Sequence, residues 1–163
     1  MRCADILNFV EAPRASLIHF VPRFFTLLEA EKLLPRVEGL LETLIEVKRD
    51  YESAESELAH ISQRIAIIGG MSVSREHVQE IRSRKDRCAR NMQTTMESFQ
   101  EIGCQLKDID TGLIDFPTLY RDREVYLCWK LGESGIGFWH HVEDGFRGRR
   151  AIDSEFLANH RGD

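Results

Sequence analysis

The sequence predicts an α+β protein: a long antiparallel helical hairpin, coiled-coil-like in its packing, with a small antiparallel β-sheet of about three strands at its base. Three observations support this fold class. Ten positions between residues 37 and 68 that are apolar, aromatic or alanine follow one another at steps of three and four residues. A second series with this spacing runs from residue 78 to 102. After Gly103 the spacing changes to two, which is typical of strands.

The first long helix is expected to begin near Thr26, because Thr26 and Glu29 have the spacing of a capping box. Pro35 lacks an N–H and clashes with the preceding turn, so we expect a short helix before it and a kink or restart there. The long helix then extends to about residue 68, where a glycine pair ends it. Its apolar series consists of Val37, Leu40, Leu44, Val47, Tyr51, Ala54, Leu58, Ile61, Ile65 and Ile68.

The second helix is expected to start at a cap formed by Ser72 or Ser74 and to fold back on the first helix. One antiparallel register brings both apolar series together along their whole length, which a chance pattern would rarely do. This register pairs Ile65 with Val78, Ala54 with Cys88 and Leu44 with Phe99.

The second helix also carries a run of basic residues. A basic helix face can bind phosphates, but the hairpin register sets this run opposite acidic residues of the first helix. Ion pairs between the helices are therefore the favoured interpretation. The basic residues are Arg82, Arg84, Lys85, Arg87 and Arg90, and the acidic ones are Asp50, Glu52, Glu55 and Glu57.

Three strands are expected at residues 104–109, 124–131 and 136–141, of which the last two form a β-hairpin. Near its start, the first helix carries apolar residues outside the series that faces the second helix. The strands should therefore pack at the base of the helical hairpin and leave its tip free.

The predicted organisation has four parts. Residues 1–24 show no clean period and are expected to be a poorly ordered extension. Residues 25–102 form the helical hairpin, with its tip at 69–74, and residues 103–148 form the small β unit. Residues 149–163 are polar and are expected to be a tail.

Composition excludes several classes of function. The chain carries 22 basic and 27 acidic residues, and a net charge of −5 gives no general reason to bind nucleic acid. No apolar run approaches the roughly 20 residues that span a bilayer, and the first residues lack the apolar stretch of a signal peptide. A cytoplasmic location follows, in which the four cysteines are reduced; their spacing fits no zinc motif.

Four stretches of the chain are distinctive: Phe25-Thr26-Leu27 through Leu33-Leu34-Pro35; Lys107-Asp108 with Gly112-Leu113-Ile114-Asp115-Phe116-Pro117; Glu124-Val125-Tyr126-Leu127-Cys128-Trp129-Lys130-Leu131-Gly132-Glu133; and Phe138-Trp139-His140. Over about residues 24–148 they resemble a prokaryotic family catalogued as domain of unknown function 2203. The resemblance implies a cytoplasmic protein and brings no activity, cofactor or catalytic residue with it. The family pattern places an acidic residue after Phe-Trp-His, where this chain has His141.

The candidate site residues lie in the β unit: Asp108, Asp110, Asp115 and His140. Carboxylates that converge in a loop can hold a hard divalent cation, with His140 as a further ligand or as a base. The competing interpretation is that the aspartates make turn hydrogen bonds and that His140 is half-buried and hydrogen-bonded. The competing interpretation is the favoured one, so no metal and no cofactor is expected.

Four aromatic residues of the β unit allow two interpretations. They can line a ligand pocket. They can also be the core of a small sheet, which is the more common role. They are Phe116, Tyr126, Trp129 and Trp139.

The favoured function is a non-enzymatic module for interaction with a protein partner or for self-association, because no nucleophile motif or phosphate-binding glycine loop is present. The alternative is a small metal- or ligand-binding unit, with catalysis as one option, centred on Asp108, Asp115 and His140 of the β region.

Overall fold

The computed structural model describes residues 23–68 and 74–163. Almost all of the predicted N-terminal extension and most of the predicted tip lie outside these ranges. The chain divides into two compact units. One consists of Glu42–Ser98, and the other combines the chain up to Leu41 with Phe99–Asp163.

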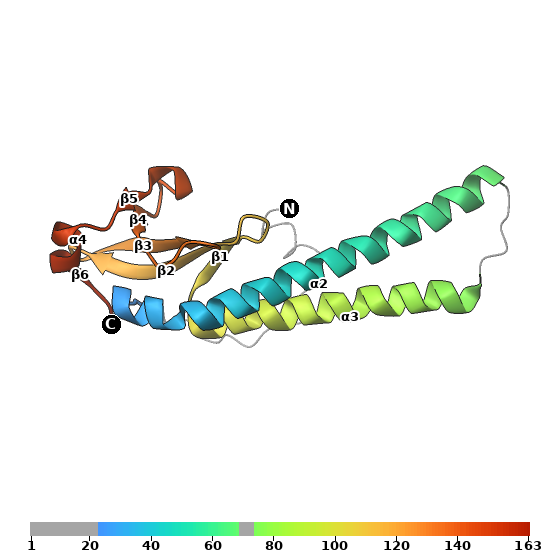
Figure 1. Ribbon diagram of the computed structural model, residues 1–163, viewed down its shortest axis with the longest axis horizontal. Helices are drawn as coiled ribbons and strands as arrows, with labels where there is room; N and C mark the ends of the chain where they lie inside the picture. The colour runs from blue at the N-terminus through green and yellow to red at the C-terminus, as the bar shows by residue number, and fades with distance from the viewer. Residues whose placement is uncertain (1–22, 69–73) are drawn as a thin grey trace. The chain divides into compact units, whose positions relative to one another are not determined.

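Two long helices pack together, as the sequence predicted: α2 (Leu27–Ile68) and α3 (Arg75–Ile102) (Figure 1). Ser74 caps α3, since its hydroxyl accepts a hydrogen bond from the His77 N–H at 3.3 Å. The two predicted apolar series do not bury each other along their whole length, because Ile65, near the end of α2, is 42% exposed. Within the unit 42–98 the buried seam residues are Leu44, Ala54, Ile81, Cys88, Met92 and Thr95.

Ion pairs join the two helices in the register that the sequence predicted. The Lys85 ammonium lies 2.8 Å from a Glu55 carboxylate oxygen, and the Arg84 guanidinium lies 2.6 Å from Glu57. Such partly exposed pairs add little stability, but they disfavour a shifted register in which like charges would meet.

The helix α2 begins as predicted but is not broken by its proline. Thr26 and Glu29 form the capping box, with the Thr26 hydroxyl 2.7 Å from the Glu29 carboxylate, which also accepts from the Thr26 N–H at 2.8 Å. The expected end of a short helix and restart at Pro35 are wrong, because one helix runs through it. Pro35 lies on an exposed face, where water can replace the hydrogen bond that its missing N–H leaves unmade.

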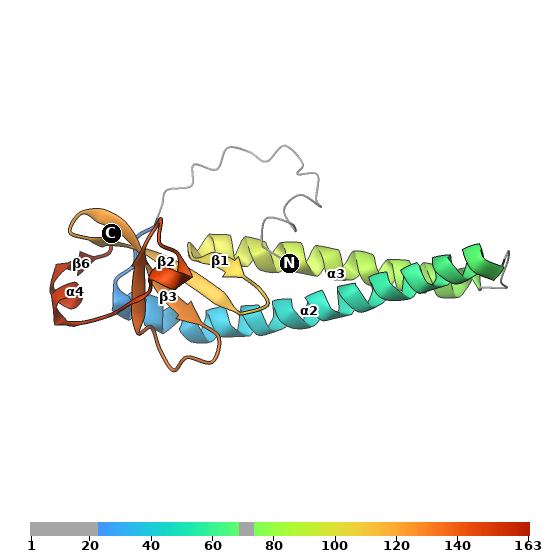
Figure 2. The same cartoon turned by 90° about the horizontal axis from the view of Figure 1, so that it is seen from above.

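Within the described residues the sheet has six strands rather than the predicted three or so, and every neighbouring pair is antiparallel. Figure 2 shows two of them, β2 and β3, side by side. Its order is β1-β2-β3-β4-β5, and β6 also pairs with β2 beyond the end of β1. Three strands match predicted ones: β1 (Gln105–Asp108), β3 (Arg123–Lys130) and β4 (Phe138–His141). The others are β2 (Leu113–Tyr120), β5 (Arg150–Ala151) and β6 (His160–Arg161).

The strand β2 contains Pro117, which cannot donate to a ladder and normally argues against a strand. Here the Pro117 carbonyl accepts a hydrogen bond from the Phe25 N–H at 2.7 Å. The proline nitrogen faces the same side, away from β3, so its missing donor costs the β2–β3 ladder nothing. Arg121 and Asp122, both with positive φ, make the two-residue turn into β3.

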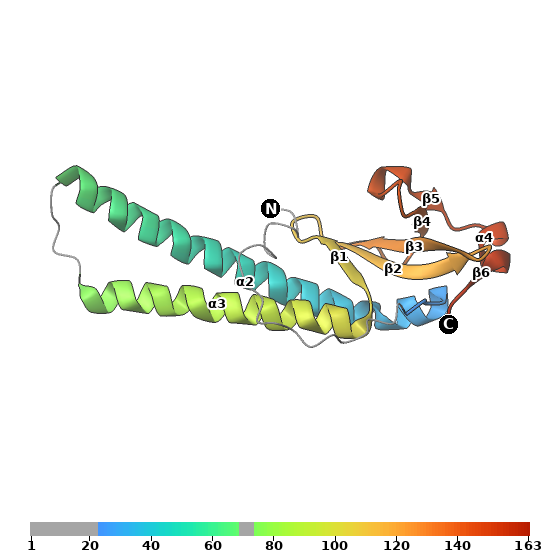
Figure 3. The ribbon, with the colours of Figure 1, turned by 180° about the vertical axis from the view of Figure 1, so that it is seen from behind.

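The predicted polar tail at 149–163 is wrong, since it forms β5, the helix α4 (Ser154–Asn159) and β6 (Figure 3). Phe156 of α4 is 1% exposed and stacks on Trp139 and Tyr120, with ring centroids 4.9 and 5.2 Å away. Burial of this aromatic side chain offsets part of the entropy cost of ordering the short segment.

The two faces of the sheet differ in chemistry. One face is apolar and carries the fully buried side chains of Ile114, Phe116 and Leu127, with Phe25 against Phe116 at 5.5 Å between ring centroids. Because side chains alternate along each strand, the opposite face receives the polar residues that lie between these positions. That polar face holds the candidate site.

Candidate functional site

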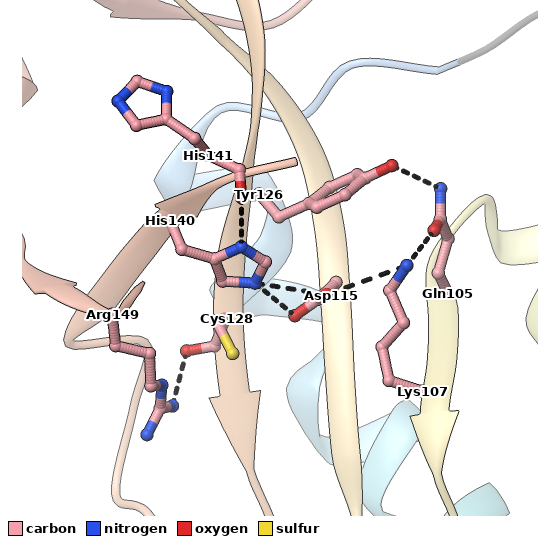
Figure 4. A network of polar contacts seen from close by, with 8 residues as sticks. All are labelled: Gln105, Lys107, Asp115, Tyr126, Cys128, His140, His141 and Arg149. Atoms are coloured by element: carbon pink, nitrogen blue, oxygen red, sulfur yellow. Dashed lines mark hydrogen bonds and ion pairs between the residues drawn. The ribbon is translucent and has the colours of Figure 1, made fainter. Parts of the chain in front are cut away.

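Three neighbouring strands bring an aspartate, a cysteine and a histidine together on the polar face of the sheet (Figure 4). Asp115 of β2 is the direct cross-strand partner of Cys128 of β3. His140 of β4 pairs with Tyr126, two residues before Cys128 on the same face. The antiparallel register therefore places all three side chains at adjacent positions.

The cluster is compact and closed to solvent. One ligand atom from each of Asp115, Cys128 and His140 lies within 4.8 Å of the others. The exposed fractions are 1%, 0% and 2%, so no member is an ordinary solvated surface group. Among the residues that the structure describes, this is the one group of three or more such side chains close enough to share a metal ion.

His140 is held through both ring nitrogens. Its Nδ1 lies 2.8 Å from the His141 carbonyl and donates to it, while Nε2 lies 3.3 Å from each carboxylate oxygen of Asp115. Burial by itself lowers the pKa of His140, but the hydrogen bonds to Asp115 and to the carbonyl outweigh it, so the net pKa is raised. With both ring nitrogens facing acceptor oxygens, His140 is a buried imidazolium paired with the buried Asp115 carboxylate.

Cys128 has the opposite character from a catalytic thiol. Burial and the nearby Asp115 charge raise the pKa of the Cys128 thiol to about 12. A nucleophilic cysteine needs a lowered pKa and access to substrate. As a proton-bearing buried thiol, Cys128 can instead be a metal ligand, since a metal ion displaces the proton.

A second group of residues surrounds the cluster. The Tyr126 ring packs edge-on against His140, with centroids 5.6 Å apart, and the Lys107 ammonium lies 3.9 Å from a carboxylate oxygen of Asp115. On the other side Arg149 donates to the Cys128 carbonyl at 2.9 Å (Figure 4). Arg149 also holds Glu133 through two hydrogen bonds of 2.7 and 2.8 Å, so its position is well defined.

The structure divides the predicted site residues. It brings Asp115 and His140 together, whereas Asp108 and Asp110 lie outside the cluster. Asp108 accepts a hydrogen bond from the Thr111 N–H at 2.8 Å, which is the turn interaction expected as the competing interpretation.

The candidate pocket aromatics are all buried, and they lie in different places. Tyr126 adjoins His140, Phe116 contacts Phe25 at the apolar face, and Trp139 stacks on Phe156. Trp129 is 1% exposed and donates from its indole nitrogen to the Glu133 carbonyl at 3.0 Å.

Sequence reasoning missed Cys128, Lys107 and Arg149 as members of this network. The sequence does place Cys128 on the polar side of β3, because Val125, Leu127 and Trp129 alternate on the other side. No local signal in the sequence marks β2, the strand that brings Asp115 opposite Cys128.

The fold and the site define an α+β protein with two long paired helices and a buried Asp–Cys–His cluster in an antiparallel sheet. The chain belongs to the family described as "Uncharacterized conserved protein (DUF2203)", whose sequence model matches residues 23–152. No curated protein and no solved structure matches the chain. Within the described ranges, no helix combines the length and apolarity needed to cross a membrane.

Proposed function

We propose that this protein binds a transition-metal dication of the zinc class, Zn²⁺ or Co²⁺, on Asp115, Cys128 and His140. The observation that carries the proposal is the meeting of these three buried ligand types within 4.8 Å of one another. Cysteine, histidine and aspartate are the side chains that bind zinc in proteins. A thiolate ligand disfavours Mg²⁺ and Ca²⁺, which prefer oxygen.

The spacing of the ligand atoms supports this proposal. Around a tetrahedral zinc ion, bond lengths of about 2.0–2.3 Å separate the ligand atoms by about 3.3–3.8 Å. His140 and Asp115 are already 3.3 Å apart, and the outer limit of 4.8 Å for the group requires an adjustment of about 1 Å.

The hydrogen bond of His140 to the His141 carbonyl also favours a ligand role. Metal-binding histidines commonly donate their other ring N–H to a backbone carbonyl or a carboxylate, which fixes the ring and its tautomer. With Nδ1 held in this way, Nε2 is the nitrogen that faces Asp115, and a metal ion that binds there takes the place of the Nε2 proton. Three protein ligands leave a fourth position for water or a small ligand.

A metal titration of the purified protein tests the proposal. We expect Zn²⁺ and Co²⁺ to raise the melting temperature and Mg²⁺ and Mn²⁺ to have little effect, since a bound ligand stabilises the folded state by about 2.7 kcal/mol at 100 times Kd. Co²⁺ should also give a thiolate charge-transfer absorption. Cys128→Ser should abolish this absorption, and Asp115→Asn and His140→Ala should each remove the shift.

Asp108→Asn is the matched control, because Asp108 is an aspartate of the same sheet whose carboxylate serves a turn. Asparagine supplies the same acceptor, so this variant should bind metal as the wild type does. If neither metal shifts the wild-type melt or gives the absorption, the cluster is a structural ion pair and the proposal is wrong.

The module for interaction or self-association that the sequence favoured stays a prediction. Light scattering over a range of concentrations tests it independently of metal, because a stable dimer doubles the measured mass.

A further inference from the structure

We infer that the Lys107 ammonium is the counter-cation of the Asp115 carboxylate when no metal is bound. The ammonium must leave this carboxylate when a metal dication binds. This inference rests on the proposed function. Its starting point is the distance of 3.9 Å between the Lys107 ammonium and Asp115 Oδ2. The ammonium is also held by the Gln105 side-chain oxygen at 2.6 Å and lies 4.7 Å from the centre of the Tyr126 ring.

The charges explain why the ammonium must leave. A dication with a cysteine thiolate and an aspartate carboxylate has a net charge of zero, because the histidine ligand is neutral. A lysine ammonium beside Asp115 would add one positive charge next to a buried dication. Like charges repel strongly where water is scarce, so Lys107 and the metal compete for the same carboxylate.

The local structure allows Lys107 to leave at little cost. Its side chain is 37% exposed, whereas that of Asp115 is 2% exposed. Lys107 lies in the first strand of the sheet order, at a register shift between Leu106 and Asp108, where it has no cross-strand partner. At an irregularity of this kind, a side chain can point toward a site although its residue pairs with none on the next strand.

The inference predicts that removing the charge at residue 107 strengthens metal binding. Lys107→Met keeps an unbranched apolar side chain but lacks the ammonium. We expect Lys107→Met to bind Co²⁺ at least about fivefold more tightly than the wild type in a calorimetric titration. Lys107→Gln is a second neutral variant, and Lys107→Arg keeps the charge and should retain roughly the wild-type affinity.

Lys130→Met is the matched control, because it makes the same change in net charge on β3, which is separated from β1 by β2. Equal affinities of Lys107→Met and Lys130→Met, with clear binding by the wild type, would overturn the counter-cation role and leave the metal site in place. Absence of binding in the wild type and in every variant would overturn both proposals. Amine labelling of the wild type gives a second measure, since Lys107 should become more reactive when Co²⁺ is added, and an unchanged reactivity contradicts its displacement.

Discussion

The backbone N–H of Leu27, the first residue of α2, donates a hydrogen bond of 3.1 Å to Nε2 of His160 in β6. The other ring nitrogen of His160 lies 3.2 Å from the Leu157 carbonyl and donates to it, so the ring accepts one hydrogen bond and donates another. Nearby, the Asp163 N–H donates to the Phe24 carbonyl at 3.1 Å. The C-terminal segment therefore caps a helix that starts 133 residues earlier in the chain (Figure 1).

The first prediction concerns the anchor of this segment. Phe156→Ala should lower the free energy of unfolding by about 3 kcal/mol, because it empties a buried position between Trp139 and Tyr120. Leu157→Ala is the control, since Leu157 is 49% exposed and should cost under about 0.5 kcal/mol. Urea unfolding followed by tryptophan fluorescence measures both. Equal losses would show that the segment is not anchored through Phe156.

A second prediction concerns the seam of the helical unit. Leu44 is fully buried, so Leu44→Asp should cost several kcal/mol through an unpaired buried carboxylate. Glu46→Ala, two residues further on an exposed face, should change stability by less than about 0.5 kcal/mol. Thermal melts distinguish these outcomes, and similar melting temperatures for the two variants contradict the burial pattern of α2.

A third prediction follows from the pair formed by Glu133 and Arg149. Hydrogen bonds from Arg149 hold the pKa of Glu133 below its ordinary value of 4.5, against the opposite effect of burial. Because the folded pKa is the lower one, the stabilisation is complete above about pH 4.5 and is lost as the pH falls through the folded value.

Glu133→Gln should therefore be less stable than the wild type by about 1 kcal/mol at pH 7, and the difference should vanish in acid. Urea unfolding at several pH values between 7 and 3 measures the effect. Glu143→Gln is the control, because Glu143 is exposed and lies in the turn after β4. A difference that stays constant with pH would mean that the charge of Glu133 is not what stabilises the fold.

A fourth prediction concerns thiol reactivity. Burial raises the pKa of Cys104 and of Cys128 to about 12, so neither thiol should react with iodoacetamide at pH 8 in the folded protein. Both should be alkylated in urea, and peptide mass spectrometry assigns the modified residues. Rapid modification of Cys128 in the folded state would contradict the closed cluster.

Local sequence patterns predicted the long helices well. The capping box of Thr26 and Glu29 is an interaction between residues three apart, so its signal is complete within one turn. The ion pairs of Glu55 and Glu57 with α3 follow from one register of two regular helices. The prediction of a helix end at Pro35 is wrong. The free-energy cost of a proline in a helix depends on whether its face of the helix is exposed, and the local sequence does not show which face that is.

By itself, then, the sequence determined the two helices, the strands β1, β3 and β4, and two members of the candidate site, Asp115 and His140. Only the tertiary structure decided that Cys128 joins them. The strand β2 carries a proline and turns through Arg121 and Asp122 without a glycine, so no local signal marks it. Its backbone is satisfied by Phe25 and by β6, which lie far away in the chain. Strand pairing is non-local, and the residues that meet across a sheet are decided by which strands become neighbours.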